Sequence, residues 1–459
     1  MKGMLSIDQL KQKVASGDID TVIVAFPDQY GKLMGKRCTA SFFLDAVASE
    51  GMHACDYILT VDMEMDVIPG YKLASWEKGY GDFHCKPDLS TLRQTTWLEK
   101  TALVLCDLEN EKTHADVGPA PRTMLKRQLK RMEAAGFGAY GASELEYFIF
   151  DETYESAFNK GYNNLKTFGN YIEDYHIFQG TKEERLNAQI RNHMDASGIP
   201  VESSKGEWGP GQHELNFRYA KILDMCDRHV IYKQGVKEIA HAQNLAVTFM
   251  AKWRTDLAGS SMHMHLSLWD KDYKENIFVG DKEFGPIKKC SDNFRYFLGG
   301  WMKHVRAITP FYAPYPTSYK RYLSQSWAPT SIAWSHDNRT AGFRVVGEGK
   351  SLRIEARFPG ADANPYLAFA ATVAAGLDGI QNKVEPPPVF QGDVYSARDL
   401  PKVPANLLEA VSHLESSDML KEAFGADVVE HYVHYFKTEQ SKFDQVVTDW
   451  ERARYFERA

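Results

Sequence analysis

Charged and imidazole side chains recur at two-residue spacing in three strand-like segments of this chain. The segments are ASELEYFIF with Glu144 and Glu146, SSMHMHLSL with His263 and His265, and LRIEARFP with Arg353, Glu355 and Arg357. Side chains at positions i and i+2 of a β-strand lie on the same face, so each segment is predicted to direct its polar groups into one space. A fourth segment, Glu207–Glu214, brings two more carboxylates together through a Gly/Pro turn.

These acidic groups are numerous enough to require compensating charge. One such pair alone most often marks the solvated face of an antiparallel sheet. Here the residues between the polar positions are apolar, and charges are rarely buried unpaired. Oxygen-rich ligands with a single histidine favour Mg²⁺ or Mn²⁺, because zinc prefers Cys and His. We therefore expect a divalent-metal site.

Several arginines lie in the C-terminal half, close to one another in sequence. They are Arg321, Arg339, Arg344, Arg353 and Arg357. Guanidinium groups that face metal-bound oxygens are typical of phosphate transfer. The alternative, that they only solvate loops, explains a clustered set less well.

The elements that must position these residues divide the chain into two domains. Residues 1–112 alternate helix, β-type runs and turns, with a strand predicted over Asp20–Phe26. Residues 113–459 mix long helices with strands, which makes the protein α+β. We expect helices over Arg122–Ala135 and over Asp427–Phe456, the latter with an apolar side.

One nucleotide-binding motif is present in the wrong context. Gly136-Phe-Gly-Ala-Tyr-Gly141 matches GxGxxG, but it follows a predicted helix and leads into a predicted strand. The dinucleotide fingerprint needs the opposite order, because the phosphate must meet a helix N-terminus. We interpret the segment as a helix end and a tight turn.

Composition excludes several classes of protein. The chain has 459 residues and a formal net charge of −7, and 44% of its residues are hydrophobic, as in ordinary globular proteins. This acidic balance argues against a general nucleic-acid binder. The six cysteines include no CxxC pair, and the start lacks a signal-peptide apolar region. No apolar stretch is long enough to span a membrane, so we expect a cytoplasmic protein.

With these pieces in order, the chain resembles the glutamine synthetase family. The matching segments are ASELEYFIF, GPGQHE, GSSMHMHLSL, SYKR followed by Ala-Pro, Asn338-Arg339, Arg344, LRIEARFP and NPYL. The resemblance implies an N-terminal β-grasp-like domain and a catalytic domain with a curved antiparallel sheet and flanking helices. It also implies active sites between neighbouring subunits of a homo-oligomer, a dodecamer of two hexameric rings.

The resemblance implies a role for each matching residue. Glu146, Glu207 and Glu214 match the ligands of one metal, and Glu144, His263 and Glu355 match those of the metal that bridges the nucleotide phosphates. Glu207, His265, Ser267, Arg344 and Arg353 fall where the family contacts ATP. Gly259 and Arg321 match contacts to substrate glutamate, and Arg339 and Arg357 match the arginines that steady the transferring phosphoryl group.

The implied reaction joins an amine to the γ-carboxylate of glutamate. The carboxylate attacks the ATP γ-phosphate to give an acyl phosphate, and the amine then displaces phosphate. Two or three Mg²⁺ or Mn²⁺ ions per active site would neutralise charge between the two anionic reactants.

The most informative departure from the family concerns the nucleophile. Between SYKR and Ala-Pro, glutamine synthetases carry a Glu that helps bind ammonium, and here that position is Trp327. Loss of an anionic partner should weaken ammonium binding, whereas an indole ring can cover the apolar tail of an organic amine. We expect an organic amine, with methylamine as the leading candidate, as in the branch of the family that contains γ-glutamylmethylamide synthetases.

Two further departures concern smaller features. The loop whose Asp helps to deprotonate ammonium is missing, and Asp56, which follows His53-Ala-Cys55, is our candidate for the base. Its alternative role is a turn or cap residue. Ser261 stands where the family often has Gly, and we derive no consequence from the sequence alone.

Three functions follow from this reasoning. The first is a ligase that joins glutamate to a small organic amine. The second is a glutamine synthetase that uses ammonia. The third is a non-catalytic member that senses nitrogen, although the complete set of metal and arginine residues argues against it.

Overall fold

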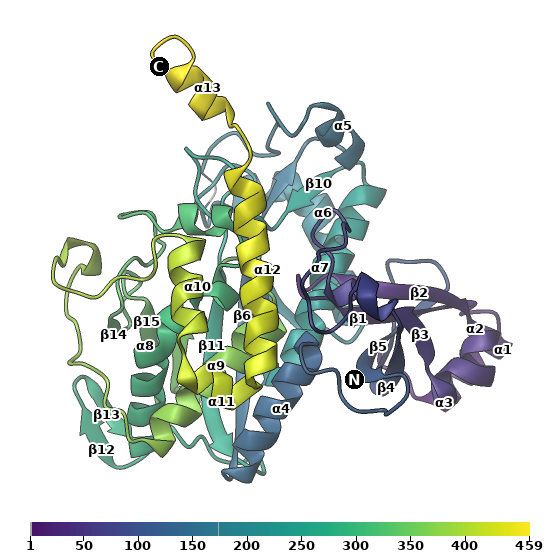
Figure 1. The fold of residues 1–459 in the computed structure, drawn as a ribbon, viewed down its shortest axis with the longest axis horizontal. Helices are drawn as coiled ribbons and strands as arrows, with labels where there is room; N and C mark the ends of the chain where they lie inside the picture. The colour runs from purple at the N-terminus through teal and green to yellow at the C-terminus, as the bar shows by residue number, and fades with distance from the viewer. Residues whose placement is uncertain (1, 173) are drawn as a thin grey trace.

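A five-stranded sheet forms the N-terminal part of the molecule. The computed structural model describes residues 2–172 and 174–459. The strand order is β2 (Leu33–Thr39), β1 (Thr21–Pro27), β5 (Thr101–Asn110), β4 (Asp82–Gln94) and β3 (Met52–Cys55). One face of this sheet has its own hydrophobic core with helix α1 (Ile7–Ala15), and Figure 1 shows this part to one side of the larger body. The predicted strand over Asp20–Phe26 is confirmed as β1.

A curved nine-stranded sheet forms the centre of the larger part. Its main path runs β14 (Trp334–His336), β15 (Phe343–Val346), β16 (Arg353–Ala356), β11 (Met262–Asp270), β6 (Phe137–Phe150), β8 (Gln212–Phe217) and β7 (Val201–Gly206). Strands β9 (Ala220–Lys221) and β10 (Ala246–Thr248) pair with β6. All pairings are antiparallel except β14 with β15. The predicted α+β class is confirmed, and the domain boundary after residue 112 stays a prediction.

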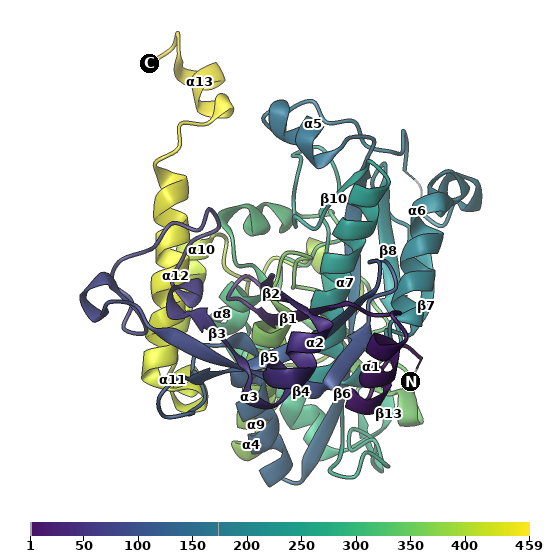
Figure 2. The same cartoon turned by 90° about the vertical axis from the view of Figure 1, so that its right-hand side faces the viewer.

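Helices cover one face of this sheet and the flanks of the molecule. Against it lie α4 (Pro121–Ala134), α7 (Ile222–Ala242), α8 (Asp292–Tyr312) and α9 (Pro365–Gln381), and α10 (Leu407–Glu415), α11 (Asp418–Phe424) and α12 (Ala426–Asp444) pack outside them. Helix α6 (Ile177–Ala196) packs on β7 and α7. The smaller elements are α2 (Ala40–Phe42), α3 (Ala48–Glu50), α5 (Tyr154–Asn159), β12 (Lys282–Phe284) and β13 (Ile287–Cys290). Figure 2 shows β7 and α6 at the opposite end of the molecule from α12.

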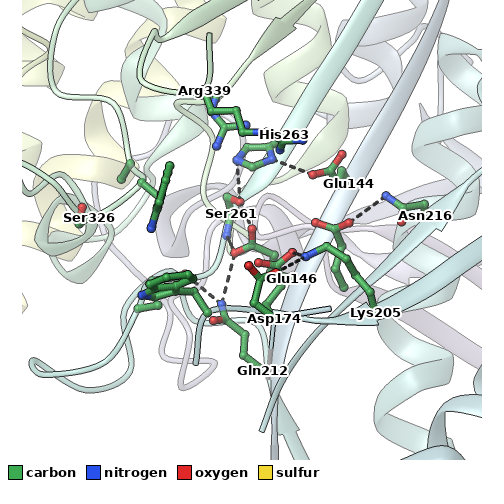
Figure 3. A pocket seen from close by; sticks show the side chains of 18 of the residues that line it. Glu144, Glu146, Asp174, Lys205, Gln212, Asn216, Ser261, His263, Ser326 and Arg339 are labelled. Atoms are coloured by element: carbon green, nitrogen blue, oxygen red, sulfur yellow. Dashed lines mark hydrogen bonds and ion pairs between the residues drawn. The ribbon is translucent and has the colours of Figure 1, made fainter. Parts of the chain in front are cut away.

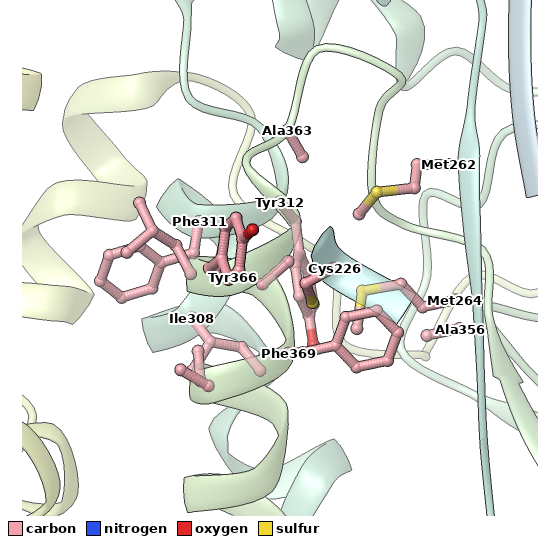
Figure 4. Packing of buried hydrophobic residues seen from close by; sticks show 14 of the residues in the cluster. Cys226, Met262, Met264, Ile308, Phe311, Tyr312, Ala356, Ala363, Tyr366 and Phe369 are labelled. Atoms are coloured by element: carbon pink, nitrogen blue, oxygen red, sulfur yellow. The ribbon is translucent and has the colours of Figure 1, made fainter. Parts of the chain in front are cut away.

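The alternation of β11 explains which face of the sheet is free. Met262 and Met264 point into the core, where they approach Tyr366 and Phe369 of α9 (Figure 4). The alternating residues His263 and His265 therefore point to the other face, which the helices leave uncovered. The sheet thus separates an apolar layer from a polar one.

Two further expectations can be compared with the structure. The helix over Arg122–Ala135 is confirmed as α4, and Gly136 follows it and leads into β6, as interpreted. The prediction of a single terminal helix over Asp427–Phe456 is wrong, because α12 ends at Asp444 and a separate helix follows as α13 (Asp449–Tyr455). Val447 and Trp450, two apolar residues of this segment, are exposed, and Figure 1 shows α13 projecting away from the body. No helix in the described residues is both long and apolar enough to cross a membrane.

Candidate active site

The register of the central strands places the predicted polar residues side by side. Glu144 of β6 is paired with His263 of β11, and Glu146 of β6 is paired with Glu214 of β8. On the next strands, His265 is paired with Glu355 of β16. Side chains that are directly opposite in a sheet lie within contact distance, so this register alone brings the acidic groups together.

These residues line one cavity of about 610 Å³ on the free face of the sheet (Figure 3). The predicted residues in its lining are Glu144, Glu146, Glu207, Glu214, Gly259, His263, His265, Arg321, Trp327, Arg339, Arg344, Arg353 and Arg357. Glu355 is buried directly beneath them, in contact with two of the arginines. Segments more than 200 residues apart in sequence therefore converge on one space.

Three carboxylates form the first candidate metal group. Ligand oxygens of Glu146, Glu207 and Glu214 all lie within 4.8 Å of one another. Burial, followed by the charge of Glu207, raises the pKa of Glu146 to about 8. Burial and then the charge of Glu144 raise the pKa of Glu214 well above its usual value. Mutual repulsion of this kind is relieved by a bound divalent cation, so the donor set fits Mg²⁺ or Mn²⁺.

Hydrogen bonds hold the carboxylates of this group in place. Ser261 donates from its backbone nitrogen to Glu146 Oε2 at 2.8 Å and from its hydroxyl to Oε1 at 2.7 Å. Gln212 Nε2 lies 3.3 Å from Glu146 Oε2, and Lys205 Nζ lies 2.5 Å from Glu207 Oε1. Sequence reasoning missed these supporting roles. Lys205 could have been predicted, because a lysine two residues before Glu207 in a strand would share its face.

A second group lies beside the first. Glu144 Oε1 is 2.9 Å from His263 Nδ1, and Glu355 Oε1 is 3.7 Å from the same nitrogen. Burial, followed by the charge of Arg357, lowers the pKa of His263, which favours the neutral imidazole that a metal ligand requires. Although burial raises the pKa of Glu144, hydrogen bonds with His263 and His265 outweigh this effect and hold it well below its usual value. The group can therefore hold a second divalent cation.

Arginines surround the second group. Arg344 lies 2.9 Å from Glu355 Oε2, and Arg357 lies 2.6 Å from Glu355 Oε1. Burial opposes ionisation of Glu355, but nearby positive charge, above all that of Arg357, outweighs it and lowers the pKa of Glu355 to about 2. Arg353 Nε lies 3.3 Å from His265 Nδ1, which connects the arginines to β11. Arg339 is exposed at the rim of the cavity.

At the far end of the cavity, Gly259 packs against Arg321. A Cβ atom at Gly259 would lie 2.4 Å from Arg321 Cγ, so only glycine fits without displacing that side chain. Arg321 is buried, and its guanidinium donates to the carbonyl of Phe358. Its Nε has no hydrogen-bond partner among the described residues and is available to an anionic group.

Comparison with known proteins identifies the family. Residues 119–455 match the model of the glutamine synthetase catalytic domain. The chain belongs to the glutamine synthetase family. The prediction of an ATP-dependent C–N ligase of this family is confirmed.

Several relatives cover nearly the whole chain. The γ-glutamylethanolamide synthetase GlnA4 of Streptomyces coelicolor is 46% identical over 99% of this chain and 96% of that protein. The glutamate–isopropylamine ligase of a Pseudomonas species is 32% identical over 98% and 97%. A solved structure described as a GmaS/ADP complex has a TM-score of 0.85 and 27% identity, and it covers 97% of this chain and 99% of that one.

The loop that carries Trp327 borders the main cavity. The Trp327 side chain is 48% exposed, and its ring centroid lies 5.9 Å from that of Trp208. The backbone of Trp327 has φ +62°, which is unusual for a bulky residue and is typical of strained functional sites. A second cavity of about 730 Å³ shares Trp208 and Trp327 with the main one, so the aromatic pair stands between two spaces.

Besides Glu355, two predicted residues lie outside the lining of the main cavity. Ser267 lines a neighbouring cavity of about 510 Å³ with Tyr140, Tyr219 and Trp269, and its hydroxyl accepts a hydrogen bond from Trp269 Nε1 at 2.9 Å. Glu144, His265 and Arg353 line both cavities, so the two are adjacent. Asp56 lies in the N-terminal part, where it accepts a hydrogen bond from Gly81 N at 3.1 Å, and it does not line this chain's main cavity. Its role as a base stays a prediction.

Proposed function

We propose that this enzyme joins a small organic amine to the γ-carboxylate of glutamate at the expense of ATP, through a γ-glutamyl phosphate intermediate. The observation that carries the proposal is one cavity that combines two divalent-metal donor sets, a ring of arginines and an aromatic wall formed by Trp208 and Trp327. Ligation requires the metals and arginines for the phosphoryl transfer. The aromatic wall bears on the choice of nucleophile.

Each of the two donor sets would hold one divalent cation. Glu146, Glu207 and Glu214 would hold one Mg²⁺ or Mn²⁺, and Glu144, His263 and Glu355 would hold another. When bound, these cations supply charge neutralisation between glutamate and the ATP phosphates. A third ion per active site is part of the family expectation.

The side chains perform the remaining tasks. Arg321 and the backbone of Gly259 hold glutamate with its γ-carboxylate toward the ATP γ-phosphate. Arg339 and Arg357 stabilise the negative charge on the phosphoryl group as it transfers. His265, Ser267, Arg344 and Arg353 bind ATP, whose adenine fits the aromatic cavity around Ser267. The amine nitrogen then attacks the acyl phosphate carbon, and phosphate leaves.

The Trp208–Trp327 pair favours an amine with a hydrocarbon tail. An indole ring contributes apolar contact and, before deprotonation, cation–π attraction to an ammonium group. An alkylamine resembles a lysine side chain, with an ordinary pKa of about 10.4, and therefore needs a base. We propose Asp56 of a neighbouring subunit for this step, within a dodecamer of two hexameric rings in the cytoplasm.

Phosphate release with glutamate, ATP and a panel of amines tests the proposal. The panel contains ammonia, methylamine, ethanolamine and isopropylamine. An organic amine should give the highest kcat/KM. Preference for ammonia over every organic amine would show that the protein is a glutamine synthetase in activity, and no turnover with any nucleophile would favour the non-catalytic alternative.

A further inference from the structure

The face of the N-terminal sheet opposite its own hydrophobic core carries a cluster that the ligase reaction does not use. His84 of β4 is paired with Glu109 of β5 across the sheet, and His114 lies in the turn that follows β5. We call these three residues the His84 cluster. Their ligand atoms all lie within 4.8 Å of one another. They do not line the main cavity.

Hydrogen bonding fixes which nitrogen of His84 faces the cluster. His84 Nε2 lies 2.7 Å from the backbone carbonyl of Glu50, which can only accept, so Nε2 carries the hydrogen. His84 Nδ1 is the nitrogen that faces Glu109 Oε2, at 3.1 Å, where a bound cation would replace the hydrogen between them. Histidine metal ligands characteristically donate their second nitrogen to a carbonyl in this way.

The spacing of the cluster also suits a metal ion. Glu109 Oε2 lies 3.1 Å from His84 Nδ1 and 3.5 Å from His114 Nδ1. Two ligands at about 2.0–2.2 Å from a tetrahedral ion are separated by about 3.4 Å. Glu109 and His84 are largely buried, whereas the His114 side chain is 63% exposed and leaves an open side for entry and for a water ligand.

We propose that His84, Glu109 and His114 form a binding site for a zinc-like divalent transition metal in the N-terminal domain. Two imidazoles and one carboxylate are a donor set for zinc, in contrast to the oxygen-rich groups of the active site. Lys86 lies 3.1 Å from Glu109 Oε1, so it occupies the other carboxylate oxygen and leaves Oε2 for the metal. The metal joins β4, β5 and the turn after β5, and it thereby fixes that turn.

Zinc binding by the full chain tests the proposal, with excess Mg²⁺ present to occupy the active-site carboxylates. The wild-type protein should bind one more Zn²⁺ per chain than His114→Ala or His84→Ala. A His413→Ala control, in α10, should keep the wild-type count. His114 is exposed, so His114→Ala tests the site even if His84→Ala fails to fold.

A spectroscopic measurement identifies the ligands. Co²⁺ in place of zinc should give visible absorption of a tetrahedral site in the wild-type protein, and His114→Ala should lose most of it. An equal zinc count and an unchanged cobalt spectrum in wild type and His114→Ala would overturn the proposal. In that case the cluster is a proton-linked ion pair only.

Discussion

Ser261 holds both carboxylate oxygens of Glu146, one through its backbone nitrogen and the other through its hydroxyl. The same hydroxyl lies 3.0 Å from Nε2 of His263, so a single side chain joins the two metal groups. Ser261, for which we derived no consequence from the sequence alone, therefore orients a ligand in each group. Outer residues of this kind tune metal affinity.

Replacement of Ser261 should weaken metal activation. In Ser261→Ala the backbone hydrogen bond remains and the hydroxyl is lost, so the Mg²⁺ concentration for half-maximal activity should rise about 10- to 100-fold. Activity measured against Mg²⁺ concentration checks this, with Ser412→Ala on α10 as the control. An unchanged Mg²⁺ dependence would contradict the assignment.

Removal of the Glu355 carboxylate should abolish turnover. In Glu355→Ala, Arg344 and Arg357 lose a shared partner and the second metal group loses a ligand. Because a metal ion supplies several kcal/mol of charge stabilisation, kcat should fall at least about 10³-fold. Thermal unfolding of the variant should confirm that it is folded, and retained activity would show that Glu355 is not a ligand.

Trp327→Glu should shift the enzyme toward ammonia. The new carboxylate offers a charged hydrogen-bond acceptor to ammonium, and the loss of the indole removes contact with the amine tail. The ratio of kcat/KM for ammonia to that for the best organic amine should rise about tenfold or more. Trp327→Phe serves as the control, because it keeps an aromatic ring. The same amine profile in Trp327→Glu as in wild type would refute our account of this position.

Gly259→Ala should raise the KM for glutamate. The added methyl group displaces Arg321, and a lost hydrogen bond to a charged group costs about 1.5–3 kcal/mol, or about 10- to 100-fold in binding. Steady-state kinetics with varied glutamate checks this. Gly180→Ala on α6 is a matched control, because a Cβ atom there meets nothing within 4 Å. An equal rise in KM in both variants would contradict the predicted contact.

Metal binding should strengthen as pH rises. The pKa of Glu146 is raised to about 8 without metal, so the folded protein holds a proton there that the unfolded chain releases above its ordinary value of 4.5. The contribution of this group to stability is therefore lost as pH rises from about 4.5 through about 8. Mg²⁺ replaces this proton, so the increase in Tm caused by Mg²⁺ should be larger at about pH 9 than at about pH 6. Glu146→Gln should show a smaller difference between the two pH values.

Local alternation made many of the site residues predictable. Glu144 and Glu146 could be assigned to one face because Leu145 and Tyr147, which alternate with them, are apolar. The register could not be read from the chain, since the pairing of Glu146 with Glu214 depends on strands far apart in sequence. For the same reason, no feature of the sequence predicted that Trp208 lies close to Trp327. The break between α12 and α13 was also missed, because Val447 and Trp450 continue a helical pattern through a segment that packs on nothing in the described chain.

Side chains of β11 alternate between the hydrophobic core and the active-site cavity, so folding and catalysis depend on the same strand register. A slip of this strand by one residue would carry the thioethers of Met262 and Met264 into the polar cavity and force both imidazoles among the side chains of α9. Such a misaligned chain would lose its core and its chemistry in the same event. Partly active, misregistered forms of the enzyme are therefore not expected to accumulate, and substitutions at either set of alternating positions are constrained by the other.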